Sequence, residues 1–175
     1  MDTRQQGEYA ALRDTIRQRG TIRLALVPAV FIGWAATAIA TAAVITVAIS
    51  TLVPLIVLIA GFETIFALHM NVERIGRYLQ VFHEPDGGWE HVAMAFGQKY
   101  PGGGVPDALF TQLFVFGISV NFLPVALGGD PTEIVVLAVL HLFAIYRIRM
   151  ARVAAGRQRS TDLERFIALR DAPTE

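Results

Sequence analysis

The sequence predicts an all-α membrane protein, with four transmembrane helices arranged as two antiparallel hairpins. Of its 175 residues, 54% are hydrophobic and 17% are charged, whereas soluble domains carry about 25% charged residues. No charged side chain occurs over 24–62, a run of 39 residues, or over 108–129, a run of 22 residues. Runs longer than about 18 residues are typical of membrane spans, because a helix rising about 1.5 Å per residue must cross about 30 Å of hydrocarbon.

The first uncharged run is too long for one span, since about 58 Å of helix would overrun the bilayer. The best place for a turn within it is the segment Ser50–Pro54, because proline suits the first turn of a helix. We therefore expect the first two spans over 22–49 and 52–70, joined by a very short connection.

The second pair of spans is predicted over 107–127 and 131–150. The segment Asp130–Glu133 supplies an N-cap, a proline at the first helical position and an acid at the third. Pro124 should bend the third span, because it cannot donate a hydrogen bond to the carbonyl of Val120. Arg147 lies near the inner end of the fourth span, where a long side chain can reach the membrane surface.

Charge predicts the orientation of these spans. The basic residues lie before the first span, between the second and third spans, and after the fourth: Arg4, Arg13, Arg17, Arg19, Arg23; Arg74, Arg77, Lys99; Arg147, Arg149, Arg152, Arg157, Arg159, Arg165, Arg170. Basic residues near span ends stay on the cytoplasmic side. We therefore expect a multipass protein of the cell (inner) membrane with both termini in the cytoplasm.

The segments outside the spans are also predicted to be helical and cytoplasmic. In 1–21 the apolar side chains form a narrow stripe flanked by arginine, which suits a helix lying on anionic lipid: Tyr9, Leu12, Ile16. In 71–106 the second span should continue as a helix, followed by an interfacial or re-entrant helix that carries Trp89, Val92 and Phe96 at helical spacing. In 151–175 the segment Thr161–Glu164 resembles a capping box, which predicts a separate C-terminal helix.

Three polar residues inside the spans are candidates for chemistry. Glu63 lies about 17 Å below the outer surface, His141 about 14 Å and Asn121 about 9 Å. Intramembrane acids are costly and are therefore functional by default. The functional hypothesis is a proton or ion relay from Glu63 to His141. The structural alternative is an interhelical hydrogen bond that holds the helices together.

A second group of candidates lies in the predicted cytoplasmic segment and consists of titratable residues: His69, Glu73, His83, Glu84, Asp86, Glu90, His91. Imidazoles and carboxylates are ligands for Zn, Mn or Fe. Their spacing matches no metal motif, HExxH included, so a divalent metal is a hypothesis beside the plainer one of a polar loop. A pigment ligated by His141 alone also stays open.

Small residues on the first span predict close helix packing. Four of them recur at four-residue spacing: Ala29, Gly33, Thr37 and Thr41. Gly61 offers a matching small residue on the second span. In lipid, small residues let helix backbones approach. We expect them to serve the hairpin of the first two spans, with a homo-oligomer as the alternative.

These features rank three functions. The first is a non-enzymatic accessory or scaffold subunit of a membrane complex, whose partners are lipid and protein subunits. The second is an oligomeric channel or proton-coupled transporter using Glu63 and His141, and the third is an interfacial metalloenzyme centred on His83–His91. The absence of cysteine excludes disulfides and thiolate metal sites. Acids and apolar residues interrupt the basic tail, so we expect anionic lipid rather than nucleic acid as its partner.

Overall fold

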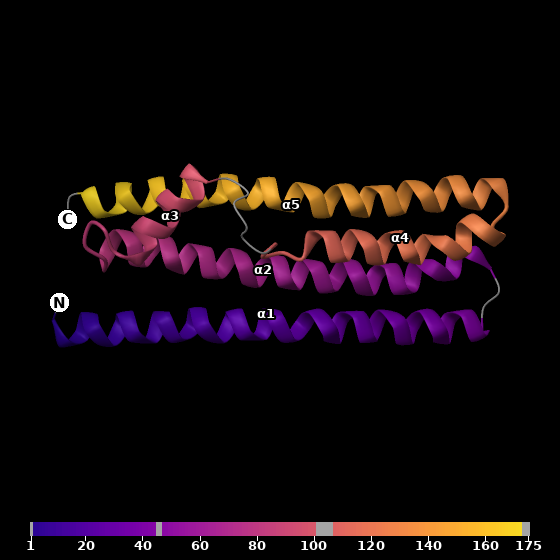
Figure 1. The fold of residues 1–175 in the computed structure, drawn as a ribbon, viewed down its shortest axis with the longest axis horizontal. Helices are drawn as coiled ribbons and strands as arrows, with labels where there is room; N and C mark the ends of the chain where they lie inside the picture. Colours follow the sequence, from indigo (N-terminus) through magenta and orange to yellow (C-terminus); the bar gives the residue numbers. More distant parts are fainter. Residues whose placement is uncertain (1, 45–46, 101–106, 173–175) are drawn as a thin grey trace. The chain divides into compact units, whose positions relative to one another are not determined.

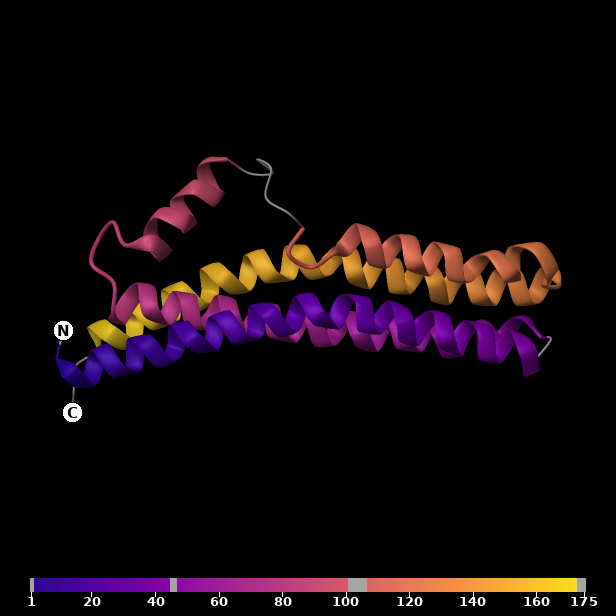
Figure 2. The same ribbon diagram turned by 60° about the horizontal axis from the view of Figure 1, so that its bottom comes forward.

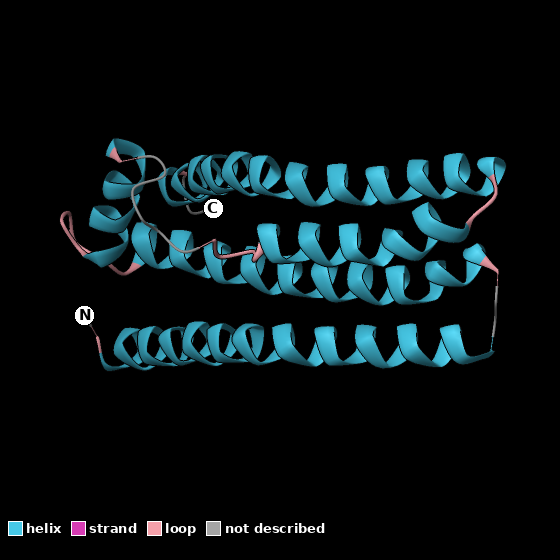
Figure 3. Ribbon diagram, turned by 45° about the vertical axis from the view of Figure 1, so that its right-hand side comes forward, coloured by secondary structure: helices cyan, strands magenta, loops and turns pink. Residues whose placement is uncertain are grey.

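The computed structural model describes residues 2–44, 47–100 and 107–172. Within these ranges the regular structure is entirely helical, and they contain no strand (Figure 3). The elements in order, with the α-helices labelled in Figure 1, are α1 (Thr3–Val44), the 3-10 helix η1 (Ala48–Thr51), α2 (Leu52–Phe82), α3 (Trp89–Lys99), α4 (Thr111–Gly128) and α5 (Pro131–Asp171).

Four stretches are long and apolar enough to cross a membrane. They are α1, η1 together with α2, α4, and α5, and their most apolar windows have mean hydropathies of 1.9, 2.2, 1.5 and 1.9. The prediction of an all-α protein with four helices long and apolar enough to cross a membrane is therefore confirmed for the described residues.

Two predicted helix starts agree with the structure, and one differs. Helix α2 begins at Leu52 and α5 at Pro131, where the Asp130 carboxylate accepts the N–H groups of Thr132 and Glu133 at 2.8 and 3.0 Å. Helix α4 begins at Thr111 rather than at the predicted residue 107. The N-cap residue is Phe110, and the Asp107 carboxylate accepts the hydroxyl of Thr111 at 3.2 Å and the backbone N–H of Gln112 at 3.4 Å in the first turn.

The predicted separate terminal helices of 1–21 and 151–175 are parts of longer helices. Helix α1 runs unbroken through Gly20 and Pro28, and α5 continues to Asp171. The capping-box interpretation of Thr161 is wrong, since its hydroxyl donates to the carbonyl of Arg157 at 3.1 Å within the helix. A cap needs an extended N-cap residue, and the residues upstream of Thr161 already form a helix.

The end of the predicted first span differs in part from the described structure. The described part of α1 reaches Val44, and the 3-10 helix η1 occupies Ala48–Thr51, where the prediction placed the end of the span at residue 49. Residues 45–46 of that span and 101–106 of the predicted cytoplasmic segment lie outside the described residues.

The chain divides into two compact units. We call Arg23–Ala67 with Asp107–Arg152 the apolar unit, and Met1–Ile22 with Leu68–Pro106 and Val153–Glu175 the charged unit. Helices α1, α2 and α5 contribute to both units, α4 belongs to the apolar unit and α3 to the charged unit.

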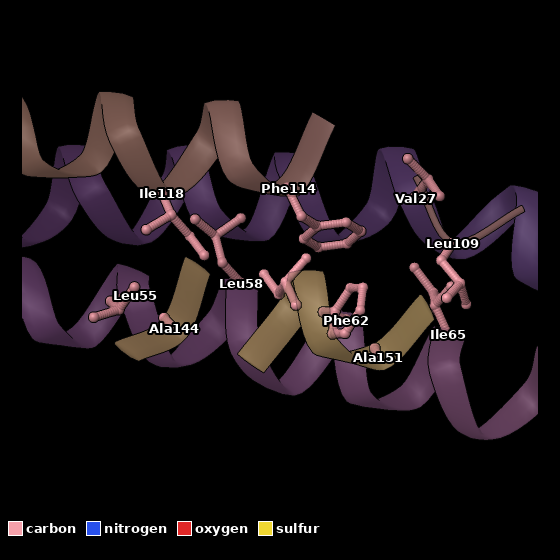
Figure 4. Packing of buried hydrophobic residues seen from close by; sticks show 11 residues of the cluster. Val27, Leu55, Leu58, Phe62, Ile65, Leu109, Phe114, Ile118, Ala144 and Ala151 are labelled. Atoms are coloured by element: carbon pink, nitrogen blue, oxygen red, sulfur yellow. The ribbon is translucent and has the colours of Figure 1, made fainter. Parts of the chain in front are cut away.

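The apolar unit has a core of aromatic and branched aliphatic side chains (Figure 4). Phe62 of α2 and Phe114 of α4 meet edge to face, with ring centroids 5.3 Å apart, and both are almost fully buried. Ile118 and Leu58 pack beside them. This core fixes the parts of α2 and α4 that carry the polar residues described below.

The charged unit combines ion pairs with aromatic contacts, since Tyr78 and Phe82 of α2 pack against Phe166 of α5. Arg74 and Arg159 pair with Asp162 and Glu73 at 3.2 and 2.6 Å, which joins α2 to the distal part of α5. Helix α3 follows α2 after a short turn and runs at an angle to it (Figure 2).

Candidate functional site

Asn121 of α4 is the centre of a buried hydrogen-bond network in the apolar unit. Its Nδ2 donates to the carbonyl of Thr51 at 2.9 Å and lies 3.0 Å from Nε2 of His141. Its Oδ1 accepts the indole N–H of Trp34 at 3.1 Å. One carboxamide therefore connects α1, η1, α4 and α5. We call the four residues involved the Asn121 network: Trp34, Thr51, Asn121 and His141.

The hydrogen bonds of His141 define its tautomer. Its Nδ1 lies 2.7 Å from the carbonyl oxygen of Leu137, and a carbonyl can only accept. Nδ1 therefore carries the proton, and Nε2 accepts from Asn121. His141 is 3% exposed and Asn121 5%. Both nitrogens of the ring are used, which suits a structural bond better than a proton carrier.

Glu63 has a different partner. Its Oε2 accepts from Nη2 of Arg147 at 2.9 Å, and the Arg147 guanidinium lies over the ring of Phe66, 5.3 Å from its centroid. Of the three predicted polar residues, the structure thus joins Asn121 to His141 and joins Glu63 to an arginine. Both side chains of the Glu63–Arg147 pair are more than a third exposed on the unit.

The small residues of α1 and α2 are placed in several ways. A Cβ at Gly61 would collide with the Val30 side chain, whereas one at Gly33 would lie 3.7 Å from Val57. The hydroxyls of Thr37 and Thr41 donate to carbonyls of their own helix, and Ala29 is exposed. Gly61 therefore marks the close approach of α1 and α2.

Several predicted metal ligands of the charged unit are engaged by arginines. Glu84 and Glu90 both accept hydrogen bonds from Arg13, and Glu90 also accepts from Nη2 of Arg77 at 3.1 Å. Glu84 further accepts the backbone N–H of Glu90 at 2.8 Å, in the first turn of α3. These contacts join α1, α2 and α3. We call the four residues involved the Arg13 network: Arg13, Arg77, Glu84 and Glu90.

Arg77 lies in this network outside the predicted span of α2. Its side chain is 6% exposed, and its Nε and Nη1 are buried without hydrogen-bond partners among the described residues. Burial lowers the pKa of Arg77, against the nearby charges of Glu73 and Glu90, which raise it. The carboxylates of Glu84 and Glu90 therefore balance the charges of Arg13 and Arg77, which makes them less available to bind a metal ion.

The other predicted ligands have separate surroundings. His91 lies 3.1 Å from the carbonyl of Gln80, His83 lies 3.8 Å from Glu8, and Glu73 is paired with Arg159. Asp86 is exposed and His69 is buried. Among the described residues, no group of three or more His, Asp or Glu side chains is placed to hold a metal ion.

The sequence does not indicate which residues form hydrogen bonds with Asn121 and Glu63. Trp34 and Thr51 look like ordinary span residues, and Arg147 looks like a residue of the membrane surface. The sequence also gives no sign of the close packing at Gly117, where a Cβ would lie 2.9 Å from the Phe31 ring. Nothing local in the sequence connects residues that are 70 to 87 positions apart. Comparisons with known protein families, curated proteins and solved structures find no match to this chain.

Proposed function

We propose that this chain is a non-enzymatic scaffold or accessory subunit of a membrane complex. In this proposal its four spans form two hairpins in the inner membrane, and both termini and α3 face the cytoplasm. The distribution of basic residues supports this orientation. A partner protein docks on α3.

The observation that carries the proposal is the exposed face of α3. Trp89, Val92 and Phe96 are 70%, 54% and 51% exposed. Their spacing of three and four residues places them on one side of the helix. Tyr100, at the end of α3, continues the row and is 49% exposed. Tryptophan and tyrosine are the residues most enriched at the energetic centres of protein interfaces.

The opposite side of α3 is fixed to the charged unit. Glu90 belongs to the Arg13 network, His91 contacts the Gln80 carbonyl, and the Gln80 amide lies 3.8 Å from the sulfur of Met94. Because these contacts hold the helix, a partner would meet a surface that is already ordered, and ordering on binding is costly.

The test is purification of the native complex in mild detergent with mass spectrometry of copurifying proteins. We expect one protein to copurify in fixed stoichiometry with the wild-type chain and to be lost from the Trp89→Ala/Phe96→Ala double variant. Leu169→Ala is the matched control, because Leu169 of α5 is 65% exposed but lies outside α3.

Two results would contradict the proposal. One is retention of the same partner by the double variant. The other is quenching of Trp89 fluorescence by brominated lipid in a Trp34→Phe variant, which would place this face of α3 in the membrane surface instead of against a protein.

A channel or proton-coupled transporter is the second candidate, and the Glu63–Arg147 pair is the observation in its favour. An ion pair on the surface of an apolar unit is costly in lipid, which makes it a candidate for an interface in an oligomer. The relay from Glu63 to His141 has less support, because each residue is bonded to another partner.

A further inference from the structure

A cavity of 590 Å³ opens in the apolar unit beside the Asn121 network. It is lined by α1, η1, the start of α2 and α4, and its volume falls within the range of about 300–1,000 Å³ that is typical of ligand sites. The proposed docking face of α3 lies in the other unit, so this cavity needs a separate explanation.

One wall of the cavity is made of small side chains of α1. Ala35, Ala38 and Ala42 recur at intervals of three and four residues and line it together with Thr41. The cavity is open at the surface of the unit, since Ile39 and Val47, which also line it, are 72% and 49% exposed. A run of alanines beside so large a space therefore leaves room for a molecule that is not part of the chain.

Another wall is polar and already ordered. Trp34, Thr51 and Asn121 line the cavity, and hydrogen bonds within the Asn121 network hold all three. The Asn121 Oδ1 has two lone pairs, of which one accepts from the Trp34 indole. The second lone pair can accept a hydrogen bond from a ligand without disturbing the network.

Pro124 adds a further acceptor to this wall. It lies inside α4 and has no N–H, so the carbonyl of Val120 lacks the donor that a regular helix would provide. Val120 and Pro124 both line the cavity. Ser50 also lines the cavity, and its hydroxyl can donate as well as accept. A ligand hydroxyl, which can both donate and accept, therefore complements this wall.

We propose that this cavity binds a lipid-soluble molecule that carries a single hydroxyl group. Its apolar body lies against Ala38 and Ala42, and its hydroxyl donates to the Val120 carbonyl or to Oδ1 of Asn121. A bare hydrocarbon chain would fill the apolar part and leave these acceptors unsatisfied, which is unfavourable away from water.

The test uses the fluorescence of Trp34 in the full-length chain. The sequence has two tryptophans, so Trp89→Phe leaves Trp34 as the single reporter. The chain is reconstituted in phosphatidylcholine vesicles and titrated with 2,2,2-tribromoethanol, whose bromines quench indole. Its matched probe is 1,1,1-tribromoethane, which has no hydroxyl.

We expect saturable quenching by the alcohol and an apparent affinity about tenfold weaker for the alkane, a factor equal to about 1.4 kcal/mol. Ala38→Leu should abolish the saturable part by filling the cavity. Ala42→Leu is a second filling variant in case the first fails to fold. Ala40→Leu should leave quenching unchanged, because Ala40 is exposed and does not line the cavity.

Three results would overturn the proposal. Quenching that rises linearly in every variant would show simple partition into lipid. Equal affinity for the two probes would remove the hydroxyl from recognition. A saturable component that disappears as the ratio of protein to lipid increases would show that a second copy of the chain fills the cavity.

Discussion

At the scale of single residues, Asn121 explains why polar groups persist inside an apolar unit. Its side chain uses both amide hydrogens and one lone pair on three different elements. Removing it would take away the hydrogen-bond partner of the Trp34 indole N–H and that of Nε2 of His141, while Nδ1 of His141 would keep the Leu137 carbonyl. The loss is costly because the remaining buried groups would be removed from water without a hydrogen-bond partner.

Asn121→Leu should therefore destabilise the protein by about 1–3 kcal/mol, since buried hydrogen bonds between membrane helices contribute about 0.6 kcal/mol each and orphaned groups add to the loss. Unfolding in mixed micelles of increasing dodecyl sulfate measures this. Ser119→Ala on the same helix is the control, because its exposed hydroxyl bonds only the Val115 carbonyl. Equal effects of the two substitutions would contradict the role of Asn121.

Glu63 and Arg147 should behave as a coupled pair. We expect Glu63→Gln and Arg147→Gln to destabilise the protein singly and to cost less together than the sum of the two. The coupling should exceed about 1 kcal/mol, the upper end for pairs in water, because lipid does not solvate the separated charges. A double-mutant cycle by the same unfolding assay measures it. Additive losses would show that the two side chains do not interact in the membrane.

Tyr78 of the charged unit should titrate above the ordinary range of a phenol. Its hydroxyl donates to Glu8 at 2.8 Å, and this bond and burial raise the pKa of Tyr78. Folding favours the neutral phenol. Tyr78 therefore adds its full contribution to the free energy of unfolding below about pH 10, and this contribution is lost as the pH rises through the higher pKa of the folded state.

This titration can be followed by NMR of ¹³C-labelled tyrosine, with Tyr78→Phe to assign the resonance. Glu8→Gln should lower the pKa of Tyr78, because the substitution removes the carboxylate that favours the neutral phenol. An unchanged midpoint in Glu8→Gln would contradict the contact between α1 and α2 in this unit.

At the scale of elements, the predictions from sequence succeeded where local chemistry decides. Asp130 and Pro131 specify the start of α5 through a cap and a fixed φ angle, and both effects are local. Thr161 shows the limit of this reasoning. A capping-box pattern can also occur in the interior of a helix. The residues before Thr161 are already helical, so Thr161 lies inside α5 and does not begin a new helix. Partners on different helices, such as Trp34 and Asn121, depend on tertiary packing, which no local pattern encodes.

Gly61 tests the packing of α1 against α2. Gly61→Ala places a methyl group against Val30, whose β-branched side chain has little freedom in a helix. We expect a loss of about 1–3 kcal/mol. The same unfolding assay should show recovery in the Gly61→Ala/Val30→Ala double variant.

Gly33→Ala is the matched control for this prediction. Its new methyl group would lie 3.7 Å from Val57, an ordinary contact. A loss as large as that of Gly61→Ala, or no rescue by Val30→Ala, would show that α1 and α2 do not pack closely at Gly61.

At the scale of the whole molecule, the division into two units follows from composition. The apolar unit contains the long uncharged runs and a core of Phe, Leu and Ile side chains, whereas arginine–carboxylate pairs join the helices of the charged unit. Buried ion pairs contribute little net stability compared with apolar packing, but losing one partner is costly. The charged unit is therefore suited to specific contacts rather than to maximal stability.

We propose that the chain crosses the membrane four times and keeps its arginines and its one lysine, Lys99, on a single side. Because the sequence has no cysteine, single-cysteine variants test this claim without background. Ile49 and Thr132 report the two predicted outer turns. Lys99 and Ser160 report the cytoplasmic side, and all four residues are exposed.

The deciding measurement is labelling of right-side-out vesicles with a membrane-impermeant maleimide. We expect Ile49→Cys and Thr132→Cys to be labelled in intact vesicles, and Lys99→Cys and Ser160→Cys to be labelled only after the membrane is opened. Labelling of Lys99→Cys in intact vesicles, together with Ile49→Cys, would contradict the four-span arrangement and the depths assigned to Glu63 and His141.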